Sequence, residues 1–220
     1  MPPEATIPLF PLGLVLLPKN PLPLHIFEER YKLMIRECLK EEKEFGIVYF
    51  SAADVQTAGC TARIEKVLKR YEDGRLDILT YGQRRFLIKE MFDQKPYLEA
   101  RVTFFDDETN VDESVCRNIA QRGADLLKQA ASSMEEQAAY NFAAADDFKS
   151  ISFLIAGYEG FSPEEKQRFL EMTSTRERLE KAVAALEKII ERTRITDEIH
   201  KIIGGNGNIA GHTGLADKPA

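Results

Sequence analysis

The sequence predicts an α+β protein in which a β-rich first half is followed by a helical second half. Tyr97–Phe105 alternates apolar and polar residues with the period of a half-buried strand. The acidic, turn-rich segment Asp106–Asn110 follows it, and apolar residues then recur at helical spacing. We therefore expect a β-rich unit over residues 1–107, a helical unit over 108–203 and a disordered tail over 204–220.

The first elements along the chain are two short strands and one helix. Ile7–Leu9 and Leu14–Leu17 are apolar stretches separated by glycine and proline, which predicts short strands joined by a turn. Because proline has no N–H to donate, we expect these strands at a sheet edge. From Phe27 to Lys40 the apolar residues change to a three-to-four spacing, which predicts a helix.

Strand signals dominate the rest of the first half. Phe45–Phe50 is a short continuous apolar run, and Leu76–Leu79 follows Asp73-Gly74, a dipeptide typical of hairpin turns. Phe86–Ile88 and Tyr97–Phe105 complete the series. Several short strands with turn signals between them predict a barrel or a strongly curled sheet.

The second half carries four helix signals. Asp112–Ser133 and Phe148–Tyr158 have helical spacing of apolar residues, and Ser162–Glu165 and Ser174–Glu177 have the capping-box pattern that starts a helix. The last of these helices stops at Gly204-Gly205, so it is expected to exceed roughly 25 residues. A helix of that length is usually a docking surface or a connecting rod.

Composition narrows the class of protein. Charged residues make up 30% of the chain and hydrophobic residues 44%, while a net charge of −6 argues against a protein whose main task is to grip phosphate groups. The cysteines, Cys38, Cys60 and Cys116, are widely spaced and odd in number, which indicates reduced thiols. No apolar run reaches the ~20 residues that span a bilayer. No basic residue precedes Leu12–Leu17, so we expect a cytoplasmic protein without a membrane partner.

Patterns that carry catalysis are missing from the sequence. It has no GxxxxGK[ST] phosphate loop, no GxSxG nucleophile elbow and no cysteine or histidine spacing that suits a metal. Acidic residues lie in solvated runs such as Lys40–Glu44 instead of in apolar surroundings. We therefore expect no enzyme, no cofactor and no metal, and a hydrolase with a cryptic site is an alternative.

The most distinctive segment is Ile7–Tyr31, which is rich in proline and leucine. One reading is a structural edge that packs on the barrel. The other is an aliphatic groove for an extended peptide, because proline-rich edges leave backbone groups that strand addition can use. On that reading the peptide- or partner-binding residues are Leu14, Leu16, Pro21, Leu22 and His25. Both readings stay open from the sequence alone.

Short motifs recur in a fixed order along the chain. They are Ile7–Leu12, Val15–Pro18, Leu22–Glu28, Arg30-Tyr31, Gly59, Ala62–Ile64, Asp73–Arg75, Gly82, Arg84–Phe86 and Arg178–Lys181. In this order they resemble the N-terminal, substrate-binding domain family of the ATP-dependent protease Lon, over about residues 7–203. The family often has Pro-Gly after its second strand, whereas this chain has Pro18-Lys19-Asn20, so the turn there is expected to differ.

The resemblance implies a fold and a role. The fold is a PUA-like β pseudo-barrel with one helix, followed by a C-terminal helical bundle that ends in a long helix. The role is recognition of unfolded or tagged substrates, in a stand-alone form without the ATPase and protease modules. The signature residues expected to be structural are Pro11, Pro23, Phe27, Glu28, Arg30 and Tyr31. Phe27 and Tyr31 would anchor the first helix, and Arg30 would tie it to a strand.

The leading functional hypothesis is a non-catalytic module that binds hydrophobic polypeptide segments or a protein partner. An RNA-binding protein is the runner-up, because PUA-like barrels often bind RNA and Arg63–Lys89 holds eight cations against four acidic residues. Ordinary solvated strand faces explain that excess more simply, so nucleic acid is not an expected partner. Whether the chain forms a homo-oligomer stays open.

Overall fold

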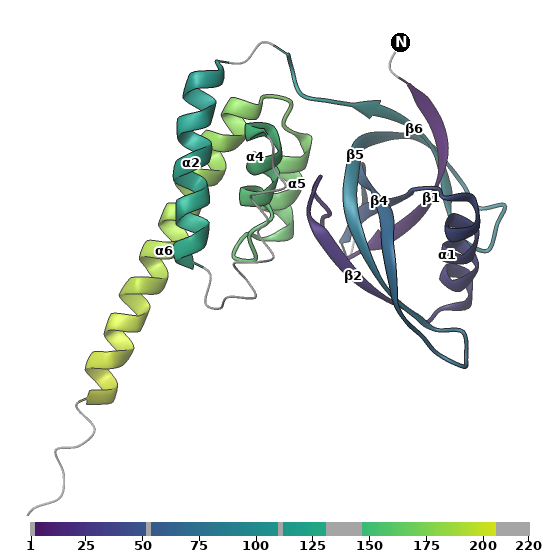
Figure 1. Ribbon diagram of the computed structural model, residues 1–220, viewed down its shortest axis with the longest axis horizontal. Coiled ribbons are helices and arrows are strands. Elements are labelled where there is room, and N and C mark those ends of the chain that lie inside the picture. Colours follow the sequence, from purple (N-terminus) through teal and green to yellow (C-terminus); the bar gives the residue numbers. More distant parts are fainter. Residues whose placement is uncertain (1–2, 52–53, 110–111, 131–146, 206–220) are drawn as a thin grey trace, which may run out of the picture.

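The computed structural model describes residues 3–51, 54–109, 112–130 and 147–205, with a β-rich half beside a helical half (Figure 1). The strands are β1 (Glu4–Leu12), β2 (Pro21–Ile26), β3 (Phe45–Ser51), β4 (Asp54–Arg70), β5 (Leu76–Phe92) and β6 (Glu99–Phe105). The helices are α1 (Glu29–Glu41), α2 (Glu113–Ala130), α4 (Phe148–Ala156), α5 (Pro163–Glu171) and α6 (Thr175–Gly205). The predicted α+β fold, with a barrel-like sheet and a helical bundle that ends in a long helix, is confirmed. The boundary expected at residue 107 stays a prediction.

Strands β1, β3, β4, β5 and β6 close into a barrel, and β2 is appended to it at β5. The sheet order is β2-β5-β4-β3-β1-β6, and β6 pairs again with β5. Register shifts along β4 between Cys60 and Lys69 mark bulges, which give the long strands the curl that closure needs. Within the described residues, β2 pairs on one side only, with Leu76–Tyr81 of β5, and we call its other side the free edge.

The first helix covers part of the barrel with one apolar face. Tyr31, Met34, Ile35 and Cys38 are buried, in agreement with the predicted helical spacing. The Tyr31 ring stacks on Phe10 of β1 with ring centroids 3.9 Å apart. This stack joins α1 to the barrel wall.

The predicted strand Leu14–Leu17 is wrong. These residues form an irregular loop, and the second strand is β2. Leu16 and Leu17 are consecutive and both buried. In a strand with one solvent-exposed face, one of two consecutive side chains would point to solvent. Their backbone lies directly against β5, where a Cβ on Gly82 would come within 2.1 Å of the Leu17 carbonyl oxygen. Packing between the barrel and the helices therefore sets the shape of this loop.

The helical half packs α2 and α4 against α6, and α6 continues well beyond α2 (Figure 1). The capping box at Ser162 is present and starts α5. α5 docks on the barrel, because Gln167 Nε2 donates to the Ala58 carbonyl at 3.1 Å and the Tyr49 hydroxyl donates to Glu164 at 2.8 Å. The expected helical residues 131–133 and tail residues 206–220 lie outside the described part of the chain. No helix within that part could cross a membrane.

Candidate functional site

The free edge of β2 presents alternate backbone groups to β5 and to solvent. Gly82 N–H in β5 donates to the Asn20 carbonyl at 3.0 Å. Because a strand has a period of two, every second residue counted from Asn20 turns its backbone groups to β5. The intervening residues Pro21, Pro23 and His25 turn theirs outward.

Two of these three outward residues are prolines, which have no N–H. An incoming strand needs donors and acceptors in alternation, and along Pro21–Pro23 it meets only carbonyl oxygens. The edge is therefore poorly suited to strand addition, which is the mode named in one of the two readings of the proline-rich segment. What this edge can offer a partner is therefore mainly its side chains.

The outward side chains form an apolar and aromatic surface, which we call the edge patch: Pro23, His25 and Phe27 beside Leu68 of β4. Phe27 is 60% exposed and Leu68 is 51% exposed. Leu68 faces outward because a bulge shifts the β4–β5 register at this point. A shallow pocket of about 370 Å³ lies here, lined by Pro23, Leu24, His25, Leu68, Asp77 and Ile78.

Hydrogen bonds hold the aromatic part of the edge patch in place. His25 Nδ1 lies 2.5 Å from one Asp77 oxygen, and the Tyr71 hydroxyl donates to the other at 2.8 Å. The bond from His25, and after it the bond from Tyr71, lowers the pKa of Asp77. The His25 ring stacks on Phe27 with centroids 6.0 Å apart. Phe27 thus rests on a fixed support, which reduces the entropy lost when a ligand binds.

The five predicted binding residues do not form one surface. Pro21 and His25 are exposed on the outer side of β2. Leu14 and Leu22 are half-buried and pack on the core. Leu16 is only 3% exposed, so the expectation that it lies at the surface is wrong, because the loop around it turns inward to fill the space between barrel and helices.

The signature residues also separate into core and surface. Tyr31 is buried as expected, and Pro11 pairs with Val48 of β3. The expectation that Phe27 anchors α1 is wrong, because it continues the outward side of β2 and precedes the N-cap of the helix, Glu28. Arg30 pairs locally with Glu28 at 2.8 Å and lies over the Tyr31 ring, and it has no strand carbonyl or carboxylate as a partner in the described part of the chain. Glu28 makes no side-chain cap bond to the helix.

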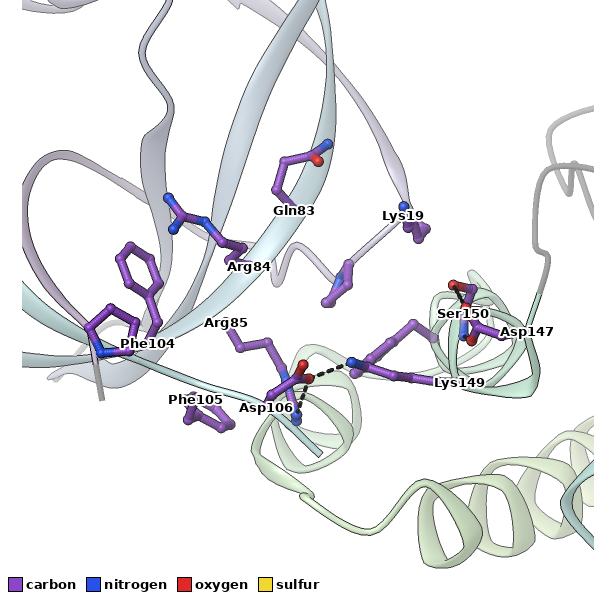
Figure 2. A pocket seen from close by; sticks show the side chains of 13 residues that line it. Lys19, Gln83, Arg84, Arg85, Phe104, Phe105, Asp106, Asp147, Lys149 and Ser150 are labelled. Carbon is purple, nitrogen blue, oxygen red and sulfur yellow. Dashed lines mark hydrogen bonds and ion pairs between the residues drawn. The ribbon is translucent and has the colours of Figure 1, made fainter. Parts of the chain in front are cut away.

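A second hollow, which we call the seam pocket, lies where the barrel meets α4 (Figure 2). Its volume is about 400 Å³. Its lining is Pro3, Pro18, Lys19, Gln83, Arg84, Arg85, Phe104, Phe105, Asp106, Asp147, Lys149, Ser150 and Phe153. Figure 2 shows Lys149 and Arg85 converging on the Asp106 carboxylate, at 2.5 Å and 3.8 Å.

A buried ion cluster joins the two halves below this pocket. Asp107 bonds to both Arg85 of β5 and Arg178 of α6, and all three side chains are buried. The two guanidiniums also donate to the Met172 carbonyl at the end of α5, and Arg178 lies 3.8 Å from the centroid of the Phe153 ring. Burial lowers the pKa of Arg85, and Asp107 opposes that shift. The cluster satisfies helix-end carbonyls and fixes the orientation of the helical half.

Sequence reasoning missed Leu68, the exposure of Phe27, the seam pocket and this cluster. Arg85 and Arg178 were both within the resembling motifs, but nothing local distinguishes a buried arginine from a solvated one. Among the described residues, no group of three or more histidine, cysteine or acidic side chains could hold a metal. The three cysteines are buried, and burial raises the pKa of Cys38 to about 12.

A mixed β-barrel bound to a helical bundle with one long final helix is the architecture of Lon N-terminal domains. The crystal structure of a Lon N-terminal domain protein from Xanthomonas campestris aligns with a TM-score of 0.60 at 24% identity, covering 82% of this chain and 98% of that one. The N-terminal domain of the Mycobacterium avium complex Lon protease aligns with a TM-score of 0.66 at 16% identity, covering 83% and 98%. These likenesses establish the fold.

The family follows from the sequence match. Residues 6–188 match the family described as the ATP-dependent protease La (LON) substrate-binding domain, and the chain belongs to that family. Lon protease of Anaeromyxobacter dehalogenans is 28% identical over 91% of this chain, and Lon protease 2 of Myxococcus xanthus is 28% identical over 90%. The chain spans about 25% of the length of each of these two relatives.

Proposed function

We propose that the chain is a non-catalytic module that binds unfolded or hydrophobic polypeptide segments through the edge patch, and that it works in the cytoplasm. The observation that carries the proposal is the exposed pair Phe27 and Leu68 beside a hydrogen-bonded His25. Uncovered apolar side chains held rigidly on a folded surface are typical of interaction sites. The description of the family as a substrate-binding domain supports a polypeptide as the occupant.

An extended polypeptide suits the shape of the edge patch. Its side chains alternate in direction, so an apolar residue can lie over Phe27 while its neighbours face solvent. The missing N–H groups of Pro21 and Pro23 prevent a full ladder with the bound segment. Binding of this kind depends little on the ligand's sequence beyond its apolar positions, as recognition of unfolded chains requires.

The histidine in the patch supports binding more than catalysis. His25 bonds to Asp77, but in the described residues no serine, threonine or cysteine bonds to its imidazole. A nucleophile activated by this pair would need such a hydroxyl or thiol within hydrogen-bond reach. We therefore assign His25 and Asp77 to the support of Phe27.

Binding of a fluorescent peptide of alternating leucine and serine, measured by anisotropy, tests the proposal. Phe27→Ser removes one large apolar side chain from the patch, and burial of such a side chain contributes about 1.5–3 kcal/mol. We expect Phe27→Ser to weaken binding by roughly tenfold or more. Leu68→Ser is expected to act in the same direction.

Phe50→Ser is the matched control, because Phe50 is 48% exposed on β3 and lies outside the edge patch. It should bind the peptide like the unmodified protein. The proposal would be contradicted if the Phe27→Ser and Leu68→Ser variants, both folded by circular dichroism, bound the peptide as tightly as the unmodified protein does. A loss of peptide affinity in Phe50→Ser as large as the loss in Phe27→Ser would also contradict the proposal.

RNA binding is the competing function, and the ion pairs weaken the case for it. Four of the eight cations of Arg63–Lys89 are paired with acidic side chains: Arg63, Arg75, Arg84 and Arg85. Binding to phosphates falls steeply with salt, whereas apolar binding does not. Peptide affinity that is the same at low and moderate salt, together with no measurable RNA binding, would support polypeptide binding. RNA binding that falls steeply with salt would support the competing function.

A further inference from the structure

The seam pocket combines an aromatic wall with positive charge. Phe104, Phe105 and Phe153 supply the rings, and Lys19, Arg84, Arg85 and Lys149 supply the cations. Two acidic residues, Asp106 and Asp147, oppose these four cations in the lining. Glu44 and Asp107, which lie outside the lining, pair with Arg84 and Arg85 and offset their charge, so among the described residues the positive charge left without a partner at the pocket is that of Lys19. A pocket of this kind favours a ligand that carries both an apolar group and a negative charge.

Most of these cations are already engaged within the fold. Arg84 lies over Phe104 and 3.3 Å from Glu44, Arg85 bonds to Asp107, and Lys149 bonds to Asp106. Lys19 differs, since in the described part of the chain its ammonium has no hydrogen-bond or ion-pair partner. It is exposed at the rim of the pocket. Lys19 is thus the cation that remains available to a ligand.

The backbone at Lys19 is strained, and this is a separate observation. Lys19 has a φ of 66°, in the left-handed region that glycine adopts more readily than any residue with a side chain. The turn is held there because Lys19 N–H donates to the Gly82 carbonyl at 2.8 Å and Asn20 Nδ2 donates to the Phe153 carbonyl at 3.0 Å. Lysine here occupies a conformation that suits glycine, and the expected difference from the family's turn stays a prediction. Strain of this kind concentrates at functional positions.

From these two observations we infer that the seam pocket is an acidic-residue subsite of the polypeptide-binding module. A carboxylate of the bound chain pairs with Lys19, and a neighbouring apolar side chain lies against Phe105, the partly exposed ring of the lining. This inference rests on the proposed function, because it takes a polypeptide as the ligand. It adds a preference for acidic segments that the edge patch alone does not provide. The carboxylate comes from an aspartate or glutamate side chain or from a chain terminus, which share the same chemistry.

Three labelled peptides distinguish these sources. The first has a central Phe-Glu and an amidated end, the second has Phe-Gln and an amidated end, and the third has Phe-Gln and a free terminal carboxylate beside a phenylalanine. We expect one or both carboxylate peptides to bind roughly fivefold more tightly than the Gln peptide at low salt. A gain with the first peptide identifies a side-chain carboxylate, and a gain with the third identifies a chain terminus.

The gain should depend on Lys19. Lys19→Gly should remove it while raising Tm by roughly 2–3 °C, because glycine relieves the backbone strain. Lys19→Arg should keep the gain, and so should Lys40→Gln, which removes an exposed lysine of α1 outside the pocket. Phe27→Ser should weaken all three peptides and leave their ratio unchanged.

Equal affinity of the Glu, Gln and free-carboxylate peptides would overturn the inference and leave the proposed function standing. The same holds if Lys40→Gln removes the gain as completely as Lys19→Gly does. Absence of binding by every peptide, including the alternating leucine–serine peptide, would overturn both the inference and the proposed function.

Discussion

Replacing Asp107 with asparagine is the sharpest test of how the two halves are held together. The change keeps the size of the side chain and removes its charge. Two buried guanidiniums, those of Arg85 and Arg178, then have no buried anion left among the residues that the structure describes. Asp106 cannot replace Asp107, because its carboxylate is 3.8 Å from Arg85 and its side chain is 72% exposed.

Removing one partner from a buried ion pair typically destabilises a protein by about 3–5 kcal/mol. The hydrogen bonds to the Met172 carbonyl and to Ser152 Oγ, which Arg178 makes at 2.9 Å and 2.8 Å, remain and favour the lower end of that range. A loss of about 3 kcal/mol is a large part of the ~5–15 kcal/mol by which most domains are stable. It should lower the urea midpoint by roughly 1–2 M.

Urea unfolding followed by circular dichroism measures this loss, and hydrogen exchange reports where it acts. The strongest increase in exchange is expected in α5 and the start of α6, whose ends the cluster ties to the barrel. Asp106→Asn is the matched control and should change the free energy of unfolding by less than about 1 kcal/mol. The reasoning would be refuted if Asp107→Asn were as stable as Asp106→Asn.

Further predictions concern the barrel. Gly82→Ala should destabilise the fold by about 1–3 kcal/mol in chemical denaturation, because the new Cβ meets the Leu17 carbonyl, whereas Gly13→Ala has open space and should be neutral. The bonds from His25 and Tyr71 lower the pKa of Asp77 in the folded protein. Their contribution to the free energy of unfolding is therefore present at neutral pH and is lost as the pH falls below about 4. Asp77→Asn should make Tm less sensitive to this fall in pH. Burial raises the pKa of Cys38 and Cys60, so both thiols should react with iodoacetamide only after unfolding, and fast labelling of the native protein would contradict this.

Elements with a strong local period could be predicted from the sequence. The helix around Met34 and Ile35, the strand at Tyr97–Phe105 and the capping box at Ser162 all follow from residues close together in the chain. The Leu14–Leu17 loop could not, because its conformation depends on contact with Gly82, far along the chain. A short apolar run is equally compatible with a strand and with a buried loop.

The candidate site could be predicted only in part. His25 was identified because it lies in the proline-rich segment, but the exposure of Phe27 depends on where β2 ends and α1 begins. Leu68 becomes exposed through a bulge, which no local pattern announces. Lys19 was noticed as a departure from the family's usual glycine, and its φ of 66° gives that departure a physical meaning.

The prolines of β2 also bear on how the protein behaves at high concentration. An exposed strand with regular N–H and C=O groups can seed the growth of ordered aggregates. Along Pro21–Pro23 the growth of a ladder stops at once, because a chain laid there finds no donors. On the proposed function, a bound segment would lie against the side chains of the edge patch without being added to the sheet.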